Sequence, residues 1–341
     1  MARSVYGLDL GTYQLKIYDK KENRIRTVKN AVAVRNETEI FATGDRAYEM
    51  FEKAPDEITI EFPMKEGVIS RIGEMQYLLE SELKPEDGFF SKGTEYVIAV
   101  PTDVSEMEKK AFFDLVIHSS ARAKEVRIVE RAAADAVGAG ISLKETAGAA
   151  IINIGGETTD ISVLARGGIV LNRLLKGGGA TIDRSIISLV RRQLDFVIGR
   201  LTAETVRIKS SVFHSGSNSM VTVAGRDLLR SRPGFRDIPD HIVRTAMKEF
   251  LRPCEEAISL MLEQTPPDVL ASIRKNGICL TGGIACTEGL DRYLEERLGI
   301  PVYTPKDPHL SAIRGVREII MSEELHDLAY SMKDENYRWM R

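Results

Sequence analysis

The stretch Ile151 to Leu164 reads IINIGGETTDISVL, and the rest of the chain is organised around it. An apolar run, a glycine-rich turn with hydroxyl side chains and a second apolar run predict a β-hairpin. Backbone N–H groups at the tip of such a hairpin suit an anionic phosphate. The stretch therefore predicts a phosphate-binding hairpin.

The opening of the chain repeats this pattern over Val5 to Tyr18. When Asp9 is aligned with Asn153, Gly11 falls on Gly155 and the apolar positions also coincide. A separation of about 144 residues (153 minus 9) is too long for a solenoid repeat and predicts two related α/β halves. We expect the two hairpins to hold one nucleotide from opposite sides of a cleft.

The composition indicates a globular protein with room for two domains of ordinary size, since the chain has 341 residues, 28% of them charged and 43% hydrophobic. A net charge of -3 argues against a nucleic-acid partner. The chain shows no secretory leader and no apolar run long enough for a bilayer, so a cytoplasmic location is expected. The three cysteines have no metal-ligand spacing and the histidines are scattered, so no structural metal is expected.

Strand and helix patterns alternate through the chain, which predicts an α/β fold. A Rossmann fold and a P-loop are both disfavoured because neither glycine signature occurs. Ser105 and Glu108 predict a capping box. Thr202 and Thr265 are predicted to begin helices, and Pro253 is predicted to kink or divide a long helix that starts at Asp240.

These features resemble the actin-like ATPase superfamily and, within it, the bacterial MreB family of cell-shape filament proteins. The resemblance rests on motifs that follow the family's order over nearly the whole chain. They are GLDLGT at 7–12, PMKEGVI at 63–69, VIAVP at 97–101, IGGETTD at 154–160, LTAETVRIK at 201–209, TPPDVLASI at 265–273 and LTGG at 280–283.

The resemblance implies an actin-like, ribonuclease H-like duplicated α/β fold. Two related halves would each carry a mixed sheet and an inserted subdomain, with a nucleotide cleft between them. The implied bounds are 1–34, 67–140 and 312–341 for the first core subdomain, 35–66 for its insertion, 141–177 and 240–311 for the second core subdomain, and 178–239 for its insertion.

The resemblance also implies a site for ATP or ADP with Mg²⁺, in which Asp9 would orient the waters around the metal. The hairpin tips would hold phosphate, and later segments would contact the adenosine. The implied nucleotide-binding residues are Gly11, Thr12, Tyr13 and Gln14, then Gly155, Gly156, Glu157 and Thr158, and then Gly178, Gly179, Glu204, Arg207, Gly282, Gly283 and Ile284.

Five positions depart from the family pattern, and two of them, Tyr13 in place of a small residue and Ile284 in place of a glycine, could narrow the nucleotide site. Asn153 stands where the family's second phosphate loop has aspartate, Arg131 stands where it has the glutamate that positions water, and Glu157 replaces a loop glycine. A guanidinium cannot accept a hydrogen bond from water. We therefore assign no catalytic residue and predict weakened hydrolysis. Two alternatives stay open: a one-residue shift that lets Glu130 serve, and pairing of Arg131 with Glu157 or with phosphate.

The function that the resemblance implies is an ATP-binding cytoskeletal protein that forms filaments and organises cell shape or wall synthesis. Its partners would be further copies of the chain, with the inner membrane surface and cell-shape membrane proteins as additional candidates.

Phe89 and Phe90 are candidates for a membrane loop, and the alternative is that both rings pack under the sheet edge. The other function classes are a non-polymerising scaffold that has lost ATPase activity and a small-molecule kinase or phosphatase. The segment from Glu318 to Arg341 is expected to dock on its own domain, with partner binding as the alternative.

Overall fold

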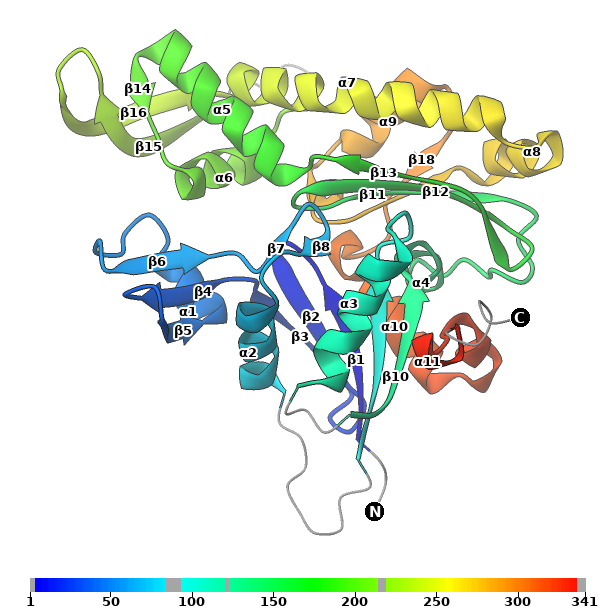
Figure 1. Cartoon of the computed structure of the whole chain (residues 1–341). Coiled ribbons are helices and arrows are strands. Elements are labelled where there is room, and N and C mark those ends of the chain that lie inside the picture. Colours follow the sequence, from blue (N-terminus) through cyan, green and yellow to red (C-terminus); the bar gives the residue numbers. More distant parts are fainter. Residues whose placement is uncertain (1–3, 84–92, 120–122, 214–218, 336–341) are drawn as a thin grey trace. The chain divides into compact units, whose positions relative to one another are not determined.

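The computed structural model describes residues 4–83, 93–119, 123–213 and 219–335 (Figure 1). The chain divides into two compact units. One contains residues 1–147, 162–174 and 310–341, and the other contains residues 148–161 and 175–309.

The first unit is built on a five-stranded sheet with the order β10-β9-β1-β2-β3. Strand β1 pairs antiparallel with β2 and parallel with β9, and β9 pairs parallel with β10. The buried side chains of β1 and β9 pack against helices, so both strands read as nearly continuous apolar runs. The elements are β1 (Ser4–Leu10), β2 (Gln14–Asp19), β3 (Arg24–Lys29), α2 (Ile72–Glu82), β9 (Thr94–Val100), α3 (Glu106–Ile117), β10 (Ala123–Glu130), α4 (Arg131–Gly138) and α10 (Ser311–Met321).

Helices α4 and α10 approach each other closely because glycines face the partner's backbone. A Cβ atom on Gly138 would lie 1.8 Å from the Ser311 carbonyl oxygen, and one on Gly315 would lie 1.8 Å from the Ala134 carbonyl oxygen. No larger side chain fits at either position. The alanine-rich sequence of α4 therefore reflects this close helix packing.

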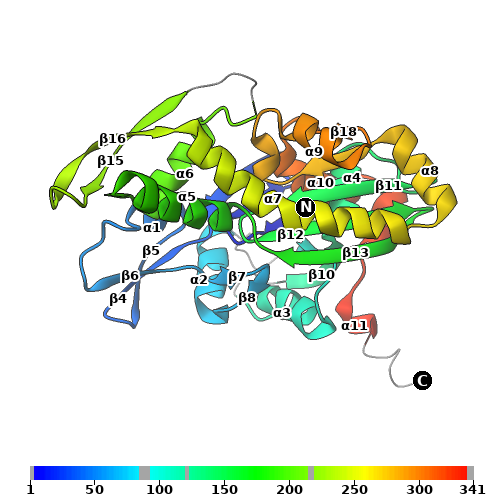
Figure 2. The ribbon, with the colours of Figure 1, turned by 90° about the horizontal axis from the view of Figure 1, so that it is seen from above.

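The second five-stranded sheet has the order β13-β12-β11-β17-β18. Helices α5 and α7 lie side by side in the second unit (Figure 2). The elements are β11 (Ala149–Ile154), β12 (Thr158–Ala165), β13 (Gly168–Lys176), α5 (Gly179–Leu194), α6 (Arg200–Lys209), α7 (Asp240–Gln264), α8 (Pro267–Asn276), β17 (Ile278–Thr281), η1 (Ile284–Cys286), α9 (Leu290–Leu298), β18 (Val302–Tyr303) and η2 (Pro308–Leu310).

The two sheets have the same topology. In each, a hairpin of two strands is extended by a third strand on one side and by two later strands on the other, so β1, β2, β3, β9 and β10 correspond to β11, β12, β13, β17 and β18. The prediction of two related α/β halves is confirmed at the level of strand order.

Along the chain, the segment that joins the third and fourth strands of each five-stranded sheet forms small sheets of its own. The first half carries β4 (Val32–Arg35), β5 (Glu39–Thr43), α1 (Gly44–Glu49), β6 (Ile58–Glu61), β7 (Met64–Lys65) and β8 (Val68–Ile69), and the second carries β14 (Phe196–Val197), β15 (Met220–Asp227) and β16 (Arg232–Pro239). The finer bounds at 35–66 and 178–239 stay a prediction.

Two predicted helix starts and the predicted division of a helix at Pro253 are wrong, although the capping box of Ser105 and Glu108 is confirmed. Helix α7 continues through Pro253. Pro253 and Glu249, whose carbonyl loses its usual donor, both lie on the exposed side of the helix, while buried neighbours hold the adjacent turns. Thr202 lies inside α6, which starts at Arg200 with Gly199 as N-cap. Thr265 ends α7 by donating its hydroxyl to the Met261 carbonyl oxygen at 2.8 Å.

The C-terminal segment docks on the edge strand of the first sheet. After η3 (Glu323–Leu328), Tyr330 forms an antiparallel bridge with Ile128 of β10, and α11 (Met332–Glu335) follows. The described part of this segment therefore packs on its own unit, as expected. Within the described ranges, no helix combines the length and apolar character that crossing a membrane requires.

Candidate functional site

The two predicted phosphate-binding hairpins close with the same turn. In the first, the Gly11 N–H donates to the Gln14 carbonyl oxygen at 3.1 Å, and in the second the Gly155 N–H donates to the Thr158 carbonyl oxygen at 2.8 Å. These pairs coincide in the alignment of the internal repeat. The repeat thus extends from sequence to backbone hydrogen bonding.

Side chains from the end of β3, the residue after it and helix α1 support the first hairpin. The Asn30 amide donates to the Gly11 carbonyl oxygen at 2.9 Å. The Tyr13 ring meets the Tyr48 ring edge-on with centroids 5.9 Å apart, and the Lys29 Nζ lies 3.6 Å from the Tyr13 centroid. Tyr13, which follows the Gly-Thr pair, is thereby held against helix α1 and the end of β3.

Asp9 lies at the end of β1 between two cations. It is 3% exposed, its Oδ2 is 2.6 Å from the Lys16 Nζ, and its Oδ1 is 3.6 Å from an Arg131 guanidinium nitrogen. The same guanidinium donates to the Leu10 carbonyl oxygen at 3.4 Å. Burial favours the neutral acid, but the Lys16 ammonium and the Arg131 guanidinium outweigh it and hold the pKa of Asp9 below its ordinary value.

Sequence reasoning did not single out Lys16. It is the direct cross-strand neighbour of Asp9, because Leu10 and Leu15 form the last pair before the turn. Counting one residue outward from the turn on each strand therefore predicts the pairing of Asp9 with Lys16 from sequence. Arg131 was noted only as a substitution, and its contact with Asp9 required the tertiary structure.

The second hairpin packs against the start of α5. The Gly179 N–H donates to the Gly155 carbonyl oxygen at 3.0 Å, and the Ala180 N–H donates to the Gly156 carbonyl oxygen at 2.8 Å. A Cβ atom on Gly178 would lie 2.3 Å from the Gly155 carbonyl oxygen. The structure therefore brings together four predicted site glycines and sets the positive end of a helix beside the turn.

The Gly282-Gly283 turn that follows β17 joins this group. Gly282 has a φ of +89°, and a Cβ atom there would lie 2.4 Å from the Ile154 carbonyl oxygen and 2.8 Å from the Asn153 Oδ1. Its N–H donates to the Pro308 carbonyl oxygen at 3.0 Å. Glycine is required here by both the conformation and the close approach.

Arg207 and Ile284 also lie beside the start of α5. A Cβ atom on Gly179 would be 3.2 Å from the Ile284 Cδ1 and 3.4 Å from an Arg207 guanidinium nitrogen. Arg207 is fixed by Asp183 of α5, whose Oδ1 lies 2.7 Å from its Nε. Burial raises the pKa of Asp183 despite this ion pair. Glu204 is on the same helix as Arg207, one turn earlier.

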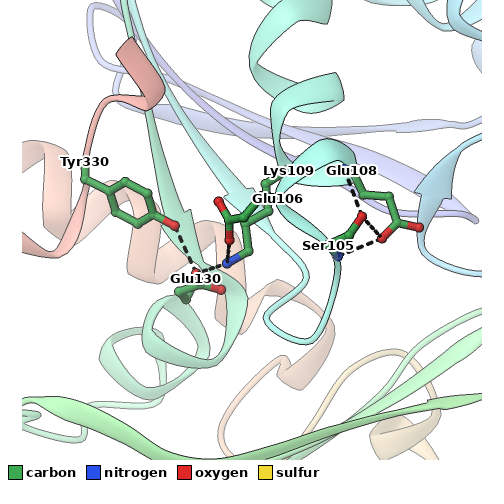
Figure 3. Close-up of polar contacts among 6 residues, drawn as sticks. All are labelled: Ser105, Glu106, Glu108, Lys109, Glu130 and Tyr330. Carbon is green, nitrogen blue, oxygen red and sulfur yellow. Dashed lines mark hydrogen bonds and ion pairs between the residues drawn. The ribbon is translucent and has the colours of Figure 1, made fainter. Parts of the chain in front are cut away.

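Glu130 belongs to a separate polar network, shown in Figure 3. Its Oε1 accepts from the Lys109 Nζ at 2.8 Å and from the Tyr330 hydroxyl at 3.0 Å, and Lys109 also lies 3.2 Å from the Glu106 Oε1. Its Oε2 is buried without a hydrogen-bond partner. Burial raises the pKa of Glu130 despite Lys109 and Tyr330. Glu130 thus points to Lys109 and Tyr330, whereas its neighbour Arg131 contacts Asp9.

Two further predictions concern the membrane loop and a structural metal. Phe89 and Phe90 lie outside the described residues. Among the residues that are described, no group of three histidine, cysteine, aspartate or glutamate side chains is arranged to hold a metal ion.

Comparison with known proteins matches the MreB/Mbl protein family model to residues 3–328. The chain is 31% identical over 306 residues to the cell shape-determining protein Mbl of Bacillus subtilis, covering 89% of this chain and 91% of that protein. It is 30% identical over 327 residues to the cell shape-determining protein MreB of Escherichia coli, covering 94% of each.

Solved structures of similar proteins confirm the predicted actin-like fold. MreB5 of Spiroplasma citri bound to AMPPNP is 27% identical, with a TM-score of 0.89 over 96% of this chain and 99% of that chain. The MamK double helical filament shares the fold at 21% identity, with a TM-score of 0.77 over 94% of this chain and 99% of that chain. By sequence, motif order and fold, this chain belongs to the MreB/Mbl family.

Proposed function

We propose that this chain is a cytoskeletal protein that binds ATP or ADP and assembles with copies of itself into filaments that organise cell shape or wall synthesis. The observation that carries the proposal is the packing of the Gly155-Gly156 turn against the start of α5 and the Gly282 turn. The family match and the nucleotides in two MreB5 structures, AMPPNP and ADP, support it.

The residues around α5 fit a nucleotide. The Gly155-Gly156 turn lies at the positive end of a 16-residue helix, which favours phosphate. The Arg207–Asp183 ion pair and Ile284 adjoin the same helix end through Gly179, and they offer polar and apolar surface to a nucleoside. Gly178, Gly179, Glu204, Arg207, Gly282, Gly283 and Ile284 therefore remain the proposed adenosine side, and residues 11–14 and 155–158 the proposed phosphate side.

Assembly is tested by light scattering and negative-stain microscopy of the purified chain with ATP, with ADP and without nucleotide. We expect nucleotide-dependent filaments. A chain that stays monomeric at high concentration in all three conditions contradicts the filament proposal and favours a non-polymerising scaffold. The substitution Arg207→Gly removes the guanidinium that pairs with Asp183. It should weaken nucleotide binding and filament formation together.

We further propose that hydrolysis is weak. Arg131 cannot accept a hydrogen bond from water, and the Glu130 carboxylate is engaged by Lys109 and Tyr330. Loss of a water-positioning base lowers turnover by a factor on the order of 10² to 10⁴. Phosphate release should be slow in the parent and faster in the double variant Arg131→Glu, Asn153→Asp. A parent rate that equals that of Escherichia coli MreB assayed in parallel contradicts this part of the proposal.

Membrane association remains a proposal from sequence. Burying two phenylalanine rings would contribute roughly 3 to 6 kcal/mol, which becomes effective when a filament repeats the contact. Liposome pelleting of the parent and of the Phe89→Ser, Phe90→Ser variant tests it. Equal pelleting of the two proteins removes these rings from the membrane contact.

A further inference from the structure

Two cations surround one carboxylate beneath the first hairpin. Asp9, Lys16 and Arg131 carry a net charge of about +1 when all are ionised, and all three side chains are largely buried. Arg131 reaches this cluster from the start of α4 and also contacts the carbonyl of Leu10, the residue just before the turn. The end of β1 is therefore positively charged before any ligand binds.

A divalent cation does not fit this cluster. Mg²⁺ takes oxygen ligands and is held at nucleotide sites by carboxylates together with phosphates. Both oxygens of Asp9 lie within ion-pair distance of a protein cation, at 2.6 Å and 3.6 Å, so both already face a cation and compete poorly as metal ligands or as acceptors for the waters around a metal. A metal ion beside Asp9 would be repelled by Lys16 and Arg131. The family's expected Mg²⁺ therefore conflicts with the residues present at Asp9.

Arg131 retains capacity to bind an anion. Its Nε is buried and has no hydrogen-bond partner, so the protein does not fully satisfy this guanidinium, and the 8% of the residue that is exposed is where an anion would reach it. The bond to Leu10 is long at 3.4 Å, and the contact with Asp9 at 3.6 Å is an ion pair without hydrogen-bond geometry. A guanidinium has five donors in a planar fork that matches phosphate oxygens, and the contacts with Leu10 and Asp9 do not use all five.

We infer that Lys16 and Arg131 replace the divalent cation in this chain, so that the phosphates of a nucleoside diphosphate or triphosphate bind without Mg²⁺ and accept hydrogen bonds from Arg131. The inference rests on the proposed nucleotide-binding function. It assigns a positive role to the substitution at Arg131: the side chain that removes the water-positioning base supplies the charge that the metal otherwise supplies.

The test is equilibrium binding of fluorescently labelled ADP to the full chain, measured by fluorescence anisotropy with excess Mg²⁺ and with EDTA. We expect dissociation constants within about 3-fold of each other. A loss of more than about 10-fold in EDTA overturns the inference and leaves the nucleotide-binding proposal standing. Absence of binding in both conditions overturns both.

Substitutions at Arg131 sharpen the result. Arg131→Gln should weaken binding in EDTA by about 10-fold or more and make the remaining affinity depend on Mg²⁺, while Arg131→Lys should recover part of the loss. Arg127→Gln is the matched control, since Arg127 lies on β10 and pairs with Glu125 at 3.6 Å. Circular dichroism melting verifies that each variant is folded. Unchanged binding by folded Arg131→Gln in EDTA overturns the role of Arg131.

Discussion

The hairpins β1–β2 and β11–β12 have the same turn and the same place in their sheets but different charges. Asp9 is aligned with Asn153, and Lys16 is aligned with Asp160. In the first hairpin the cross-strand pair is a carboxylate and an ammonium, reinforced by Arg131. In the second, an amide packs near Gly282 and the carboxylate Asp160 is 4% exposed. Duplication thus preserved backbone hydrogen bonding, while side-chain charge diverged.

The largest expected effect comes from removing the charge that distinguishes the first hairpin. Asp9→Asn leaves Lys16 and Arg131 buried without their carboxylate, which should destabilise the chain by about 3–5 kcal/mol. Asn153→Ala at the aligned position removes no charge and should cost about 1 kcal/mol. Urea unfolding followed by circular dichroism compares them. Equal losses would show that the charge cluster does not distinguish the two hairpins.

Alanine at the glycines around the two turns should be more costly beside the second hairpin, at Gly178, which is the N-cap of α5 and packs on the second turn. Gly178→Ala places a Cβ atom 2.3 Å from the Gly155 carbonyl oxygen, whereas Gly11→Ala places one 2.9 Å from the Gln14 carbonyl oxygen. Because the backbone must shift further, Gly178→Ala should cost about 1–3 kcal/mol and more than Gly11→Ala. Thermal unfolding and labelled-ADP binding measure both effects. A larger loss from Gly11→Ala would show that the contact between Gly178 and the second turn is the less restrictive of the two.

The C-terminal segment adds a contact to an edge strand of the first half, since Tyr330 bridges β10 and its hydroxyl donates to Glu130. Tyr330→Phe removes a hydrogen bond to a charged group and should cost about 1.5 kcal/mol at pH 8. Tyr330→Trp is less informative because it also changes volume.

The cost of Tyr330→Phe should depend on pH. Burial raises the pKa of Glu130 from 4.5, so its contribution to stability is fully present below 4.5 and is lost as pH rises through the higher folded-state pKa. The Tyr330 hydroxyl partly offsets this loss by stabilising the carboxylate. The variant should therefore be closer to the parent at pH 4.5 than at pH 8 in urea unfolding. A pH-independent difference would mean that Glu130 does not titrate through this contact.

The smallest effect concerns the helices that follow the corresponding strands β9 and β17. Helix α3 begins with the capping box of Ser105 and Glu108. Helix α9 begins at Leu290, and its N-cap residue Gly289 has no side chain to cap it. Ser105→Ala should cost about 1 kcal/mol, and Ser105→Thr should retain most of the stability because it keeps the hydroxyl acceptor. Thermal melting resolves the two. Equal melting temperatures for alanine and the parent would mean that the helix start is held by packing alone.

Local patterns were predictive where neighbours in sequence decide the outcome. The two hairpins and the Ser105 capping box depend on residues within a few positions of each other, so their patterns were readable. Pro253 was misjudged because its effect depends on whether the freed carbonyl is exposed and on how firmly the flanking turns are packed. That information belongs to the folded unit.

The sequence by itself determined the duplicated architecture, the glycine turns and the family, because periodicity, turn chemistry and motif order are properties of short segments. Only the tertiary structure decided that Arg131 meets Asp9 across 122 positions (131 minus 9) while the adjacent Glu130 meets Lys109 and Tyr330. The strand-to-helix junction between β10 and α4 directs two consecutive side chains to different partners, and no local pattern encodes which partner each will find.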